Sequence, residues 1–310
     1  MAAYSLVLAL LLVALGACGA ARVAVPLRAV RSQGSLTMHF DEAGSGSSAG
    51  LLQRERYVAT NRFNVKPGKE AAFEKRWATR KSRLAQLEGF RFFTLMKKRE
   101  TLKGSDESAP GYVSFTIWEE KDNFDAWRTG EAFKEAHGGG GIMDFVQLLT
   151  TALFILNGKP NPAFYDAVHP KVSPSVLVDF KDLRPPAESG WRVVEADGVN
   201  VLPPDLVVVQ DRYAVGNEGR AAFESSAAGA GQSSMPGFFC SFVQRRDAPK
   251  ADDGANYILT SLWRSIEAYK GALGESGGGS AAAAGLGLGL EPTATVLYDA
   301  KLALLSSSGP

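Results

Sequence analysis

The chain contains an internal repeat, and this repeat constrains its fold more than any single motif does. Four blocks of sequence recur in the same order. They are 61–74 (NRFNVKPGKEAAFE) with 211–224 (DRYAVGNEGRAAFE), 89–90 with 237–238 (Gly-Phe in both), 112–118 (YVSFTIW) with 257–263 (YILTSLW), and 176–181 (VLVDFK) with 296–301 (VLYDAK). Such self-similarity is the signature of duplicated structural units. The chain is therefore predicted to be a tandem duplication.

Each copy is predicted to contain the same series of secondary-structure elements. For the first copy these are strands at 57–65, 90–97, 112–118 and 175–180, a charged loop at 98–110, and helices over 69–87 and from Asp122 onward. This β-α-β-β-α-β order is that of a ferredoxin-like unit, whose sheet carries its helices on one face. The other face must be covered, and two copies in one chain can cover each other. We therefore expect an α+β fold of tandem ferredoxin-like repeats, a dimeric α+β barrel formed as an intrachain pseudo-dimer within a monomer.

The first copy is predicted to be longer than the second. Trp118 precedes Asp179 by 61 positions, whereas Trp263 precedes Asp299 by 36, which implies about 25 additional residues in the first copy. The additional residues include a glycine run at 138–141 and an apolar segment at 142–156 that is predicted to form a helix.

The first 50 residues are predicted to be a targeting presequence. An apolar run followed by small residues reads as a signal peptide over 1–20. The stretch 21–40 then carries three arginines and no acid, which resembles the bipartite presequences of algae whose plastid is reached through the secretory pathway. We therefore expect a chloroplast location, with secretion or a lipid anchor at Cys18 as alternatives. The mature chain is predicted to divide into domains 51–185 and 186–310, with no membrane span.

Composition narrows the classes of function. Lys and Arg number 34 and Asp and Glu 33, and this balance gives no electrostatic footprint for nucleic acid. Two cysteines exclude a disulfide scaffold and a zinc site built from cysteine pairs. The three histidines are His39, His137 and His169. Because His39 lies in the presequence and His169 precedes Pro170 in a predicted loop, His137 is the candidate ligand for a metal or haem iron.

One constellation of residues in the first copy points to a specific chemistry. Asn61 lies in the first strand, and Trp118, Trp127 and His137 follow within TIWEEKDNFDAWRTGEAFKEAH. In this order they resemble the antibiotic biosynthesis monooxygenase superfamily, and within it the IsdG-type haem-degrading monooxygenases and their algal low-iron-inducible relatives. The resemblance covers 57–137 strongly and the second copy weakly. It implies an O2-dependent haem monooxygenase that opens the porphyrin and releases iron.

The resemblance also implies a role for each residue of the site. Haem would be both cofactor and substrate, and a ferredoxin-type or reductase-type partner would supply electrons. His137 would bind the haem iron, for which neutral imidazole is a suitable donor. Trp127 would press on the porphyrin and distort it, and Asn61 would donate a hydrogen bond to a ligand on the iron. Phe133, on the apolar face of the same helical region, would contact the haem.

The second copy lacks this constellation. Asp211 stands at the position of Asn61, Ala272 falls at the position of Trp127, and no histidine follows His169. The second copy is therefore predicted to be a structural partner, and the chain to bind one haem.

Less specific interpretations of the same residues are available. His137 at a helix end would be stabilised in its charged form by the helix dipole. Trp127 could instead be an ordinary core residue of an amphipathic helix. Asn61 could instead form a hydrogen bond with the backbone at the end of a strand. At the level of function the alternatives are a haem-binding carrier or sensor that does not turn over, and a cofactor-free monooxygenase that acts on an aromatic substrate.

Overall fold

The computed structural model describes eight stretches of the chain. These are residues 51–78, 83–104, 109–136, 151–172, 205–229, 235–247, 254–273 and 290–305. All of them belong to one compact unit that spans residues 48–310. The predicted presequence, the glycine run at 138–141 and most of the predicted helix at 142–156 lie outside the described residues.

Each repeat supplies four strands and its own helices. The first repeat contains β1 (Arg56–Phe63), α2 (Glu70–Ala78), β2 (Phe90–Lys103), β3 (Tyr112–Trp118), α3 (Lys121–Thr129), α4 (Glu131–Ala136) and β4 (Asn161–Val172). The second repeat contains β5 (Val207–Tyr213), α7 (Arg220–Gly229), β6 (Phe238–Arg246), β7 (Tyr257–Trp263), α8 (Ile266–Leu273) and β8 (Ala294–Leu305). Short 3-10 turns occur at Leu84–Gln86 and Asn217–Gly219, and a π-helical turn at Thr151–Ile155. No helix among the described residues is both long and apolar enough to cross a membrane.

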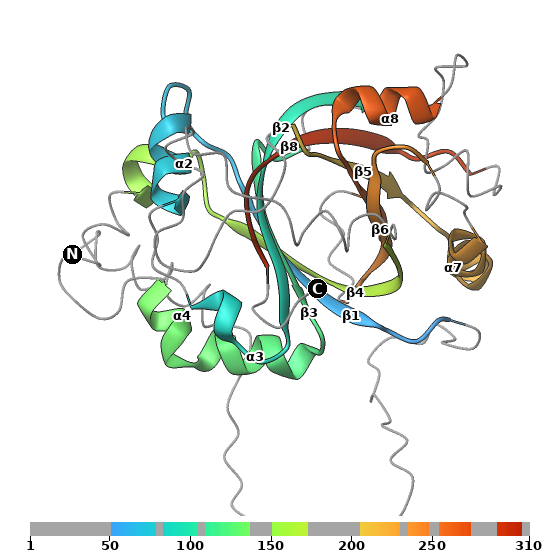
Figure 1. Ribbon diagram of the computed structural model, residues 1–310, viewed down its shortest axis with the longest axis horizontal. Helices are drawn as coiled ribbons and strands as arrows, with labels where there is room; N and C mark the ends of the chain where they lie inside the picture. Colours follow the sequence, from blue (N-terminus) through green and yellow to red (C-terminus); the bar gives the residue numbers. More distant parts are fainter. Residues whose placement is uncertain are drawn as a thin grey trace, which may run out of the picture. The chain divides into compact units, whose positions relative to one another are not determined.

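The eight strands close into one antiparallel barrel. Their order is β1-β3-β2-β8-β5-β7-β6-β4, so each repeat contributes four neighbouring strands. The two repeats join at two seams, where β2 pairs with β8 and β4 pairs with β6. Figure 1 shows α2, α3 and α4 on one side of the barrel and α7 and α8 on the other. The barrel confirms the predicted α+β fold and the intrachain pseudo-dimer.

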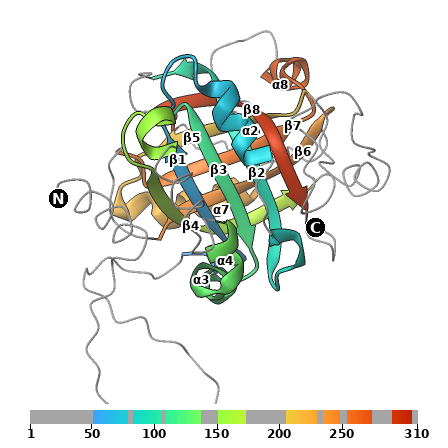
Figure 2. The same ribbon diagram turned by 90° about the vertical axis from the view of Figure 1, so that its left-hand side faces the viewer.

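The strand β1 shows how the chain separates an inner from an outer apolar layer. Val58 lies in the cluster inside the barrel, together with residues of both repeats. The alternate residues Tyr57, Ala59 and Phe63 lie in an outer cluster beneath the helices of the first repeat. Successive side chains of a strand point to opposite faces, so Asn61 belongs to the same outer face. Figure 2 shows α2, α3 and α4 in front of this face.

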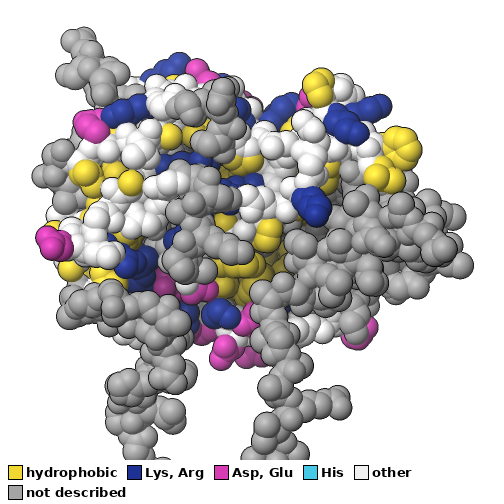
Figure 3. Space-filling model, turned by 180° about the vertical axis from the view of Figure 1, so that it is seen from behind, with side chains coloured by type: hydrophobic (Ala, Val, Ile, Leu, Met, Phe, Trp, Pro, Cys, Tyr) yellow, Lys and Arg dark blue, Asp and Glu magenta, His cyan; other side chains and the backbone are white. Residues whose placement is uncertain are grey.

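Ion pairs also link the repeats across one seam. Arg99 Nε of β2 lies 2.6 Å from Asp299 Oδ1 of β8. Lys103 Nζ, at the end of β2, lies 2.6 Å from Oε2 of Glu291, a residue that precedes β8. All four side chains are partly exposed, and such pairs contribute only about 0–1 kcal/mol each. The face seen in Figure 3 carries basic and acidic side chains beside one another, with apolar side chains between them. The strand ladder therefore contributes more to the seam than the ion pairs do.

The fourth strand of the first repeat differs from the prediction. It spans Asn161–Val172, whereas the predicted strand at 175–180 lies outside the described residues. The registers Tyr57↔Asp166 and Val207↔Asp299 show that Asp166, not Asp179, corresponds to Asp299. The tripeptide Tyr-Asp-Ala, present at 165–167 and again at 298–300, carries the true correspondence. Trp118 precedes Asp166 by 48 positions, so the first repeat is longer than the second by about 12 residues rather than 25.

Three smaller predictions were also wrong. The residues predicted to begin a loop at 98 continue β2 to Lys103, because β8 pairs with them as far as Thr295. Helix α3 is capped by Glu120 rather than Asp122: its carboxylate accepts from the helix backbone, and Asn123 accepts from Glu120 N at 3.1 Å. His169 lies in β4 rather than in a loop, at a register shift that accommodates the missing N–H of the following proline.

Candidate functional site

Asn61 lies on β1 with a side-chain oxygen that no described residue satisfies. Its Oδ1 atom is buried and has no hydrogen-bond partner among the described residues. Across the sheet Asn61 faces Ser114 on β3 and Pro162 on β4. Proline has neither a side-chain donor nor an N–H group. A buried polar atom left without a partner costs stability and is therefore a candidate for contact with a ligand.

Trp127 and Phe133 form a half-buried aromatic pair at the junction of α3 and α4. Their ring centroids lie 5.0 Å apart in an edge-to-face arrangement. The indole of Trp127 also lies 5.5 Å from Trp118 of β3 and 5.7 Å from Phe124 of α3. Trp127 thus rests on the outer apolar cluster without being fully enclosed by it. The structure brings together Trp127 and Phe133 directly and places Asn61 on the same outer face of the sheet.

The start of α3 is fixed by a close approach to the turn before β2. Gly89 has a φ of +69°, and a Cβ at this position would collide with the side chain of Asn123. Glycine is therefore required both for the backbone conformation and for the space. In the second repeat Gly237, with a φ of +76°, approaches Ala268 of α8 in the same way. The repeated Gly-Phe pair therefore sets the position of the helix that carries Trp127.

The candidate iron ligand His137 lies outside the described residues. Helix α4 ends at Ala136, the residue directly before it. The prediction that His137 binds iron therefore stays a prediction. The other three predicted site residues, Asn61, Trp127 and Phe133, are all placed by the structure.

The second repeat fills the equivalent region with its own side chains. Asp211, at the position of Asn61, is fully buried, and its Oδ1 accepts a 2.7 Å hydrogen bond from Thr295 Oγ1. Thr295 stands where the first repeat has Pro162, as the registers Asn61↔Pro162 and Asp211↔Thr295 show. Ala272, at the position of Trp127, packs against the cluster around Trp263 and provides no aromatic ring. The asymmetry between the repeats that the sequence predicts is thus present in the structure.

Two buried carboxylates, Glu74 and Glu224, are functional candidates that the sequence pattern alone does not single out, although each ends the repeated block Ala-Ala-Phe-Glu. Tyr112 Oη donates to Glu74 Oε1 at 2.6 Å, and Tyr257 Oη donates to Glu224 Oε1 at 2.7 Å. Burial, together with the hydrogen bond to Glu224, raises the pKa of Tyr257 to about 12. Burial and Glu74 shift the pKa of Tyr112 upward in the same way. Both tyrosines are therefore neutral donors at physiological pH, which suits a structural role rather than proton transfer.

Comparison with known proteins gives a family match for the first repeat. Residues 56–139 match the family model described as antibiotic biosynthesis monooxygenase. A Staphylococcus saprophyticus protein described as a staphylobilin-producing heme oxygenase is 35% identical over 85 residues, which cover 27% of this chain and 74% of that protein. A Staphylococcus haemolyticus protein of the same description is 35% identical over 81 residues, which cover 26% of this chain and 72% of that protein.

A solved structure extends the likeness to both repeats. A Fusobacterium nucleatum protein provisionally named a monooxygenase covers 84% of this chain and 98% of its own, with a TM-score of 0.52. The two sequences are 10% identical, so this likeness concerns the fold alone.

Proposed function

The chain belongs to the antibiotic biosynthesis monooxygenase family, and we propose that it is an O2-dependent haem-degrading monooxygenase whose site lies in the first repeat. The asymmetry between the repeats carries this proposal. Asn61 keeps a buried Oδ1 without a partner on the outer face of the sheet, whereas Asp211 at the related position is bonded to Thr295. The family match covers residues 56–139, which belong to the first repeat, and the staphylococcal relatives are described as heme oxygenases.

The outer apolar cluster of the first repeat suits a flat porphyrin. Trp127 and Phe133 offer half-buried rings at the junction of α3 and α4. Leu153 and Phe154 of the π-helical turn are 50% and 64% exposed, and the adjacent Ile155 packs against the same outer cluster. Exposed apolar side chains beside a half-open aromatic cluster favour a large apolar ligand. A porphyrin bound over this cluster would bury them.

The polar groups of the site would orient the substrate. Haem supplies the iron at which O2 is activated once an external donor has provided electrons, and the macrocycle is itself the molecule that is oxidised. His137, the residue after the end of α4, would hold the iron through its imidazole. The side-chain amide of Asn61 would donate a hydrogen bond to a ligand on the iron. Trp127, fixed by its contacts with Trp118 and Phe124, would press on the macrocycle from the helix side.

A haemin titration of the purified full chain tests the proposal. Addition of ascorbate in air is expected to bleach the Soret band, and a mass spectrum then identifies the tetrapyrrole product and colorimetry the released iron. A stable Soret band under these conditions would favour a haem carrier or sensor instead. Absence of haem binding would favour a cofactor-free monooxygenase of the same family.

We also propose a chloroplast location, which rests on the composition of residues 1–50 alone. Expression of the full chain fused to a fluorescent protein, in an alga whose plastid proteins are imported through the secretory pathway, tests it. Fluorescence in the plastid supports the location, and fluorescence in the medium or at a membrane contradicts it.

A further inference from the structure

A small cavity lies inside the barrel, on the face of the sheet opposite to Asn61 and Trp127. It has room for about one water molecule. The described residues that line it are Thr60, Arg62, Val113, Tyr165, Gln210, Arg212, Gln244 and Ile258. Arg62 and Arg212 are the charged members of this lining, and no carboxylate is among the eight. The cavity is therefore lined by two positively charged side chains.

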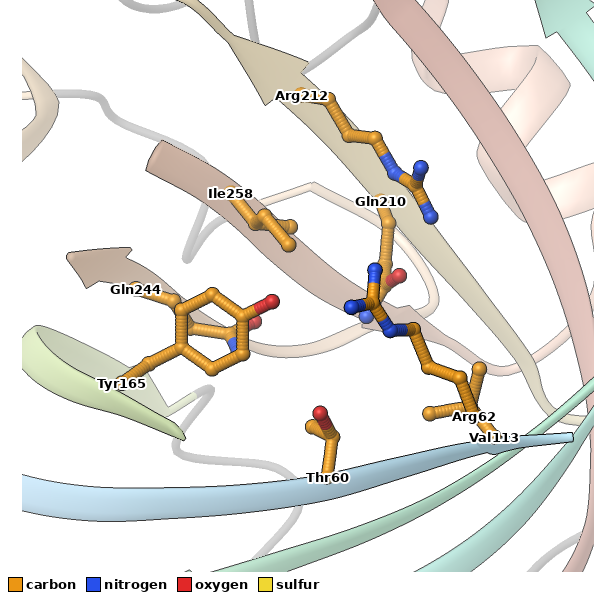
Figure 4. Close-up of a pocket in the computed structure, with 8 residues that line it drawn as sticks. All are labelled: Thr60, Arg62, Val113, Tyr165, Gln210, Arg212, Gln244 and Ile258. Carbon is orange, nitrogen blue, oxygen red and sulfur yellow. The ribbon is translucent and has the colours of Figure 1, made fainter. Parts of the chain in front are cut away.

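The cavity lies between the two repeats, and its lining follows the pseudo-twofold symmetry that relates them. Residues 60 and 62 of β1 correspond to 210 and 212 of β5, and Val113 of β3 corresponds to Ile258 of β7. Each repeat thus contributes one arginine from the same position of its first strand. Figure 4 shows the polar ends of Arg62, Arg212, Tyr165 and Thr60 turned toward one shared space. The site exists only because the repeats pair, and neither repeat could form it alone.

One side of the cavity breaks this symmetry with a polar group. Gln244 of β6 corresponds to Met96 of β2, since the pairs Gln244↔Ile258 and Met96↔Val113 occupy related registers. Gln244 is fully buried, and its Oε1 accepts a hydrogen bond from Thr260 Oγ1. Its Nε2 has no hydrogen-bond partner among the described residues. The oxygen of the Gln244 amide is therefore hydrogen-bonded, whereas its buried N–H group remains available to donate into the cavity.

Arg212 is buried and Arg62 is half-buried, and the charges of both reach the interior of the barrel. Arg212 is only 3% exposed, and Arg62 Nε donates to Asn161 O at 3.4 Å. Burial raises the pKa of the neighbouring Tyr298 to about 12, and the charges of Arg212 and Arg62 both act to lower it. The positive charge of both guanidinium groups is therefore felt within the barrel. Two guanidinium groups and an amide donor around a space for one water favour a small anion over water.

We propose that this cavity binds one small monovalent anion, of the size of chloride, between Arg62 and Arg212. Sulfate or phosphate would need several times the space. The bound anion would accept hydrogen bonds from a guanidinium group of each repeat and from Gln244 Nε2, and it would thereby stabilise the pairing of the repeats. This role is separate from haem degradation, because the anion and the proposed haem lie on opposite faces of β1.

The experiment measures thermal unfolding of the full chain without haem as sodium gluconate is replaced by sodium chloride at constant ionic strength. Gluconate is too large for the cavity. The replacement therefore distinguishes binding of chloride in the cavity from general screening of charges by salt. The midpoint is expected to rise with the logarithm of the chloride concentration once this exceeds the dissociation constant, and to be about 5 °C higher at 100 times that constant. Broadening of the 35Cl resonance by the protein, reversed by bromide, is the independent readout.

Three variants assign the effect to the cavity. Arg212→Met is expected to abolish both the rise in midpoint and the 35Cl broadening. Gln244→Met, which keeps both charges, is expected to weaken chloride binding about tenfold. Arg99→Met, which removes an arginine from the surface seam, is the matched control and is expected to keep the full effect. Should Arg212→Met fail to fold, Arg62→Met takes its place, since Arg62 is only half-buried.

Two results would overturn the proposal. One is a wild-type midpoint that responds equally to chloride and gluconate, with no 35Cl broadening. The other is a folded Arg212→Met or Arg62→Met variant that retains the wild-type chloride response, which would place the ion elsewhere.

Discussion

The indole ring of Trp127 meets the ring of Phe133 edge to face, with their planes at 83°. The two residues belong to different helices, α3 and α4. Edge-to-face pairs of this kind contribute about 0.5–1.5 kcal/mol beyond the area they bury. The contact therefore couples the orientation of α4, at whose end His137 follows, to the position of Trp127.

Replacement of Trp127 by alanine is the first test of this arrangement. We expect Trp127→Ala to bind haem but to degrade it at least tenfold more slowly, because the side chain that presses on the macrocycle is lost; tenfold corresponds to about 1.4 kcal/mol of activation free energy. Loss of its contacts with Trp118 and Phe124 should also lower the free energy of unfolding, by about 1–3 kcal/mol for a half-buried ring. Single-turnover bleaching of the Soret band and urea unfolding measure the two effects.

The variant Trp127→Phe separates packing from catalysis. It keeps a ring against the outer cluster and should recover most of the stability, with an intermediate rate of haem degradation. A wild-type rate in Trp127→Ala would show that Trp127 is only a core residue.

His137 is expected to be necessary for stoichiometric haem binding. His137→Ala should lose the Soret band of the bound haem while its far-UV circular dichroism stays unchanged, because a residue after a helix end contributes little to packing. His169→Ala is the matched control, since it removes the histidine of β4 and should bind haem normally. Unchanged haem affinity in a folded His137→Ala protein would remove this residue from the site.

Asn61 can be replaced by aspartate, the residue that the second repeat has at the equivalent position, Asp211. Asn61→Asp should slow haem degradation at least tenfold, because an ionised carboxylate accepts hydrogen bonds but cannot donate one. Asn61→Ala should have a similar kinetic effect without introducing a charge. If both variants turn over haem at the wild-type rate, the buried Oδ1 of Asn61 does not mark the substrate side of the sheet.

The sequence predicted the parts of the fold that depend on local pattern. The ungapped match of 61–74 with 211–224 correctly identified Asn61 and Asp211 as equivalent positions, because both lie at the same register of β1 and β5. The β3 and β7 blocks coincide with the observed strands. Alternation along β1 and helical spacing in α3 are local properties, and they are visible in a single sequence.

Features that depend on tertiary pairing could not be predicted in this way. Residues 98–103 are rich in charge and read as a loop, yet β8 of the other repeat extends the strand through them. The fourth strand was misplaced because VLVDFK looks like a strand, whereas Tyr-Asp-Ala in β4 is short and was overlooked. The cavity between Arg62 and Arg212 also depends on pairing, although the repeated arginine of NRF and DRY was its visible signal.

The buried carboxylates provide a stability prediction with an internal control. Glu224 is fully buried and accepts from Tyr257 Oη, from Leu52 N at 2.7 Å and from Arg245 Nη1 at 3.0 Å. Glu224→Gln should lower the free energy of unfolding by about 3 kcal/mol, because it leaves Arg245 with less compensation in a buried place. Glu74→Gln should cost about 1 kcal/mol, because its partner Lys97 is 37% exposed. Urea midpoints of both variants measure the difference, and equal losses would contradict the argument.

The architecture itself leads to a prediction about the first repeat alone. A chain that ends before Leu206 loses β5 to β8, and it thereby exposes the edges of β2 and β4 and the apolar inner face that contains Val58 and Phe115. Open edges and apolar faces drive association. In the full chain β2 pairs with β8, which corresponds to β4, and β4 pairs with β6, which corresponds to β2. Two truncated chains can therefore pair β2 of one with β4 of the other at both seams.

We expect the truncated chain to form a twofold dimer, or to aggregate, whereas the full chain is a monomer that saturates at one haem. Intramolecular pairing gives the second repeat a high effective concentration, which prevents exchange with another chain. The truncated dimer should bind two haems, because each of its repeats carries Asn61, Trp127 and His137. Light scattering after gel filtration and haem titration of both proteins measure these ratios. A truncated chain that stays a well-behaved monomer, or a full chain that binds two haems, would show that the second repeat does not take the place of a partner subunit.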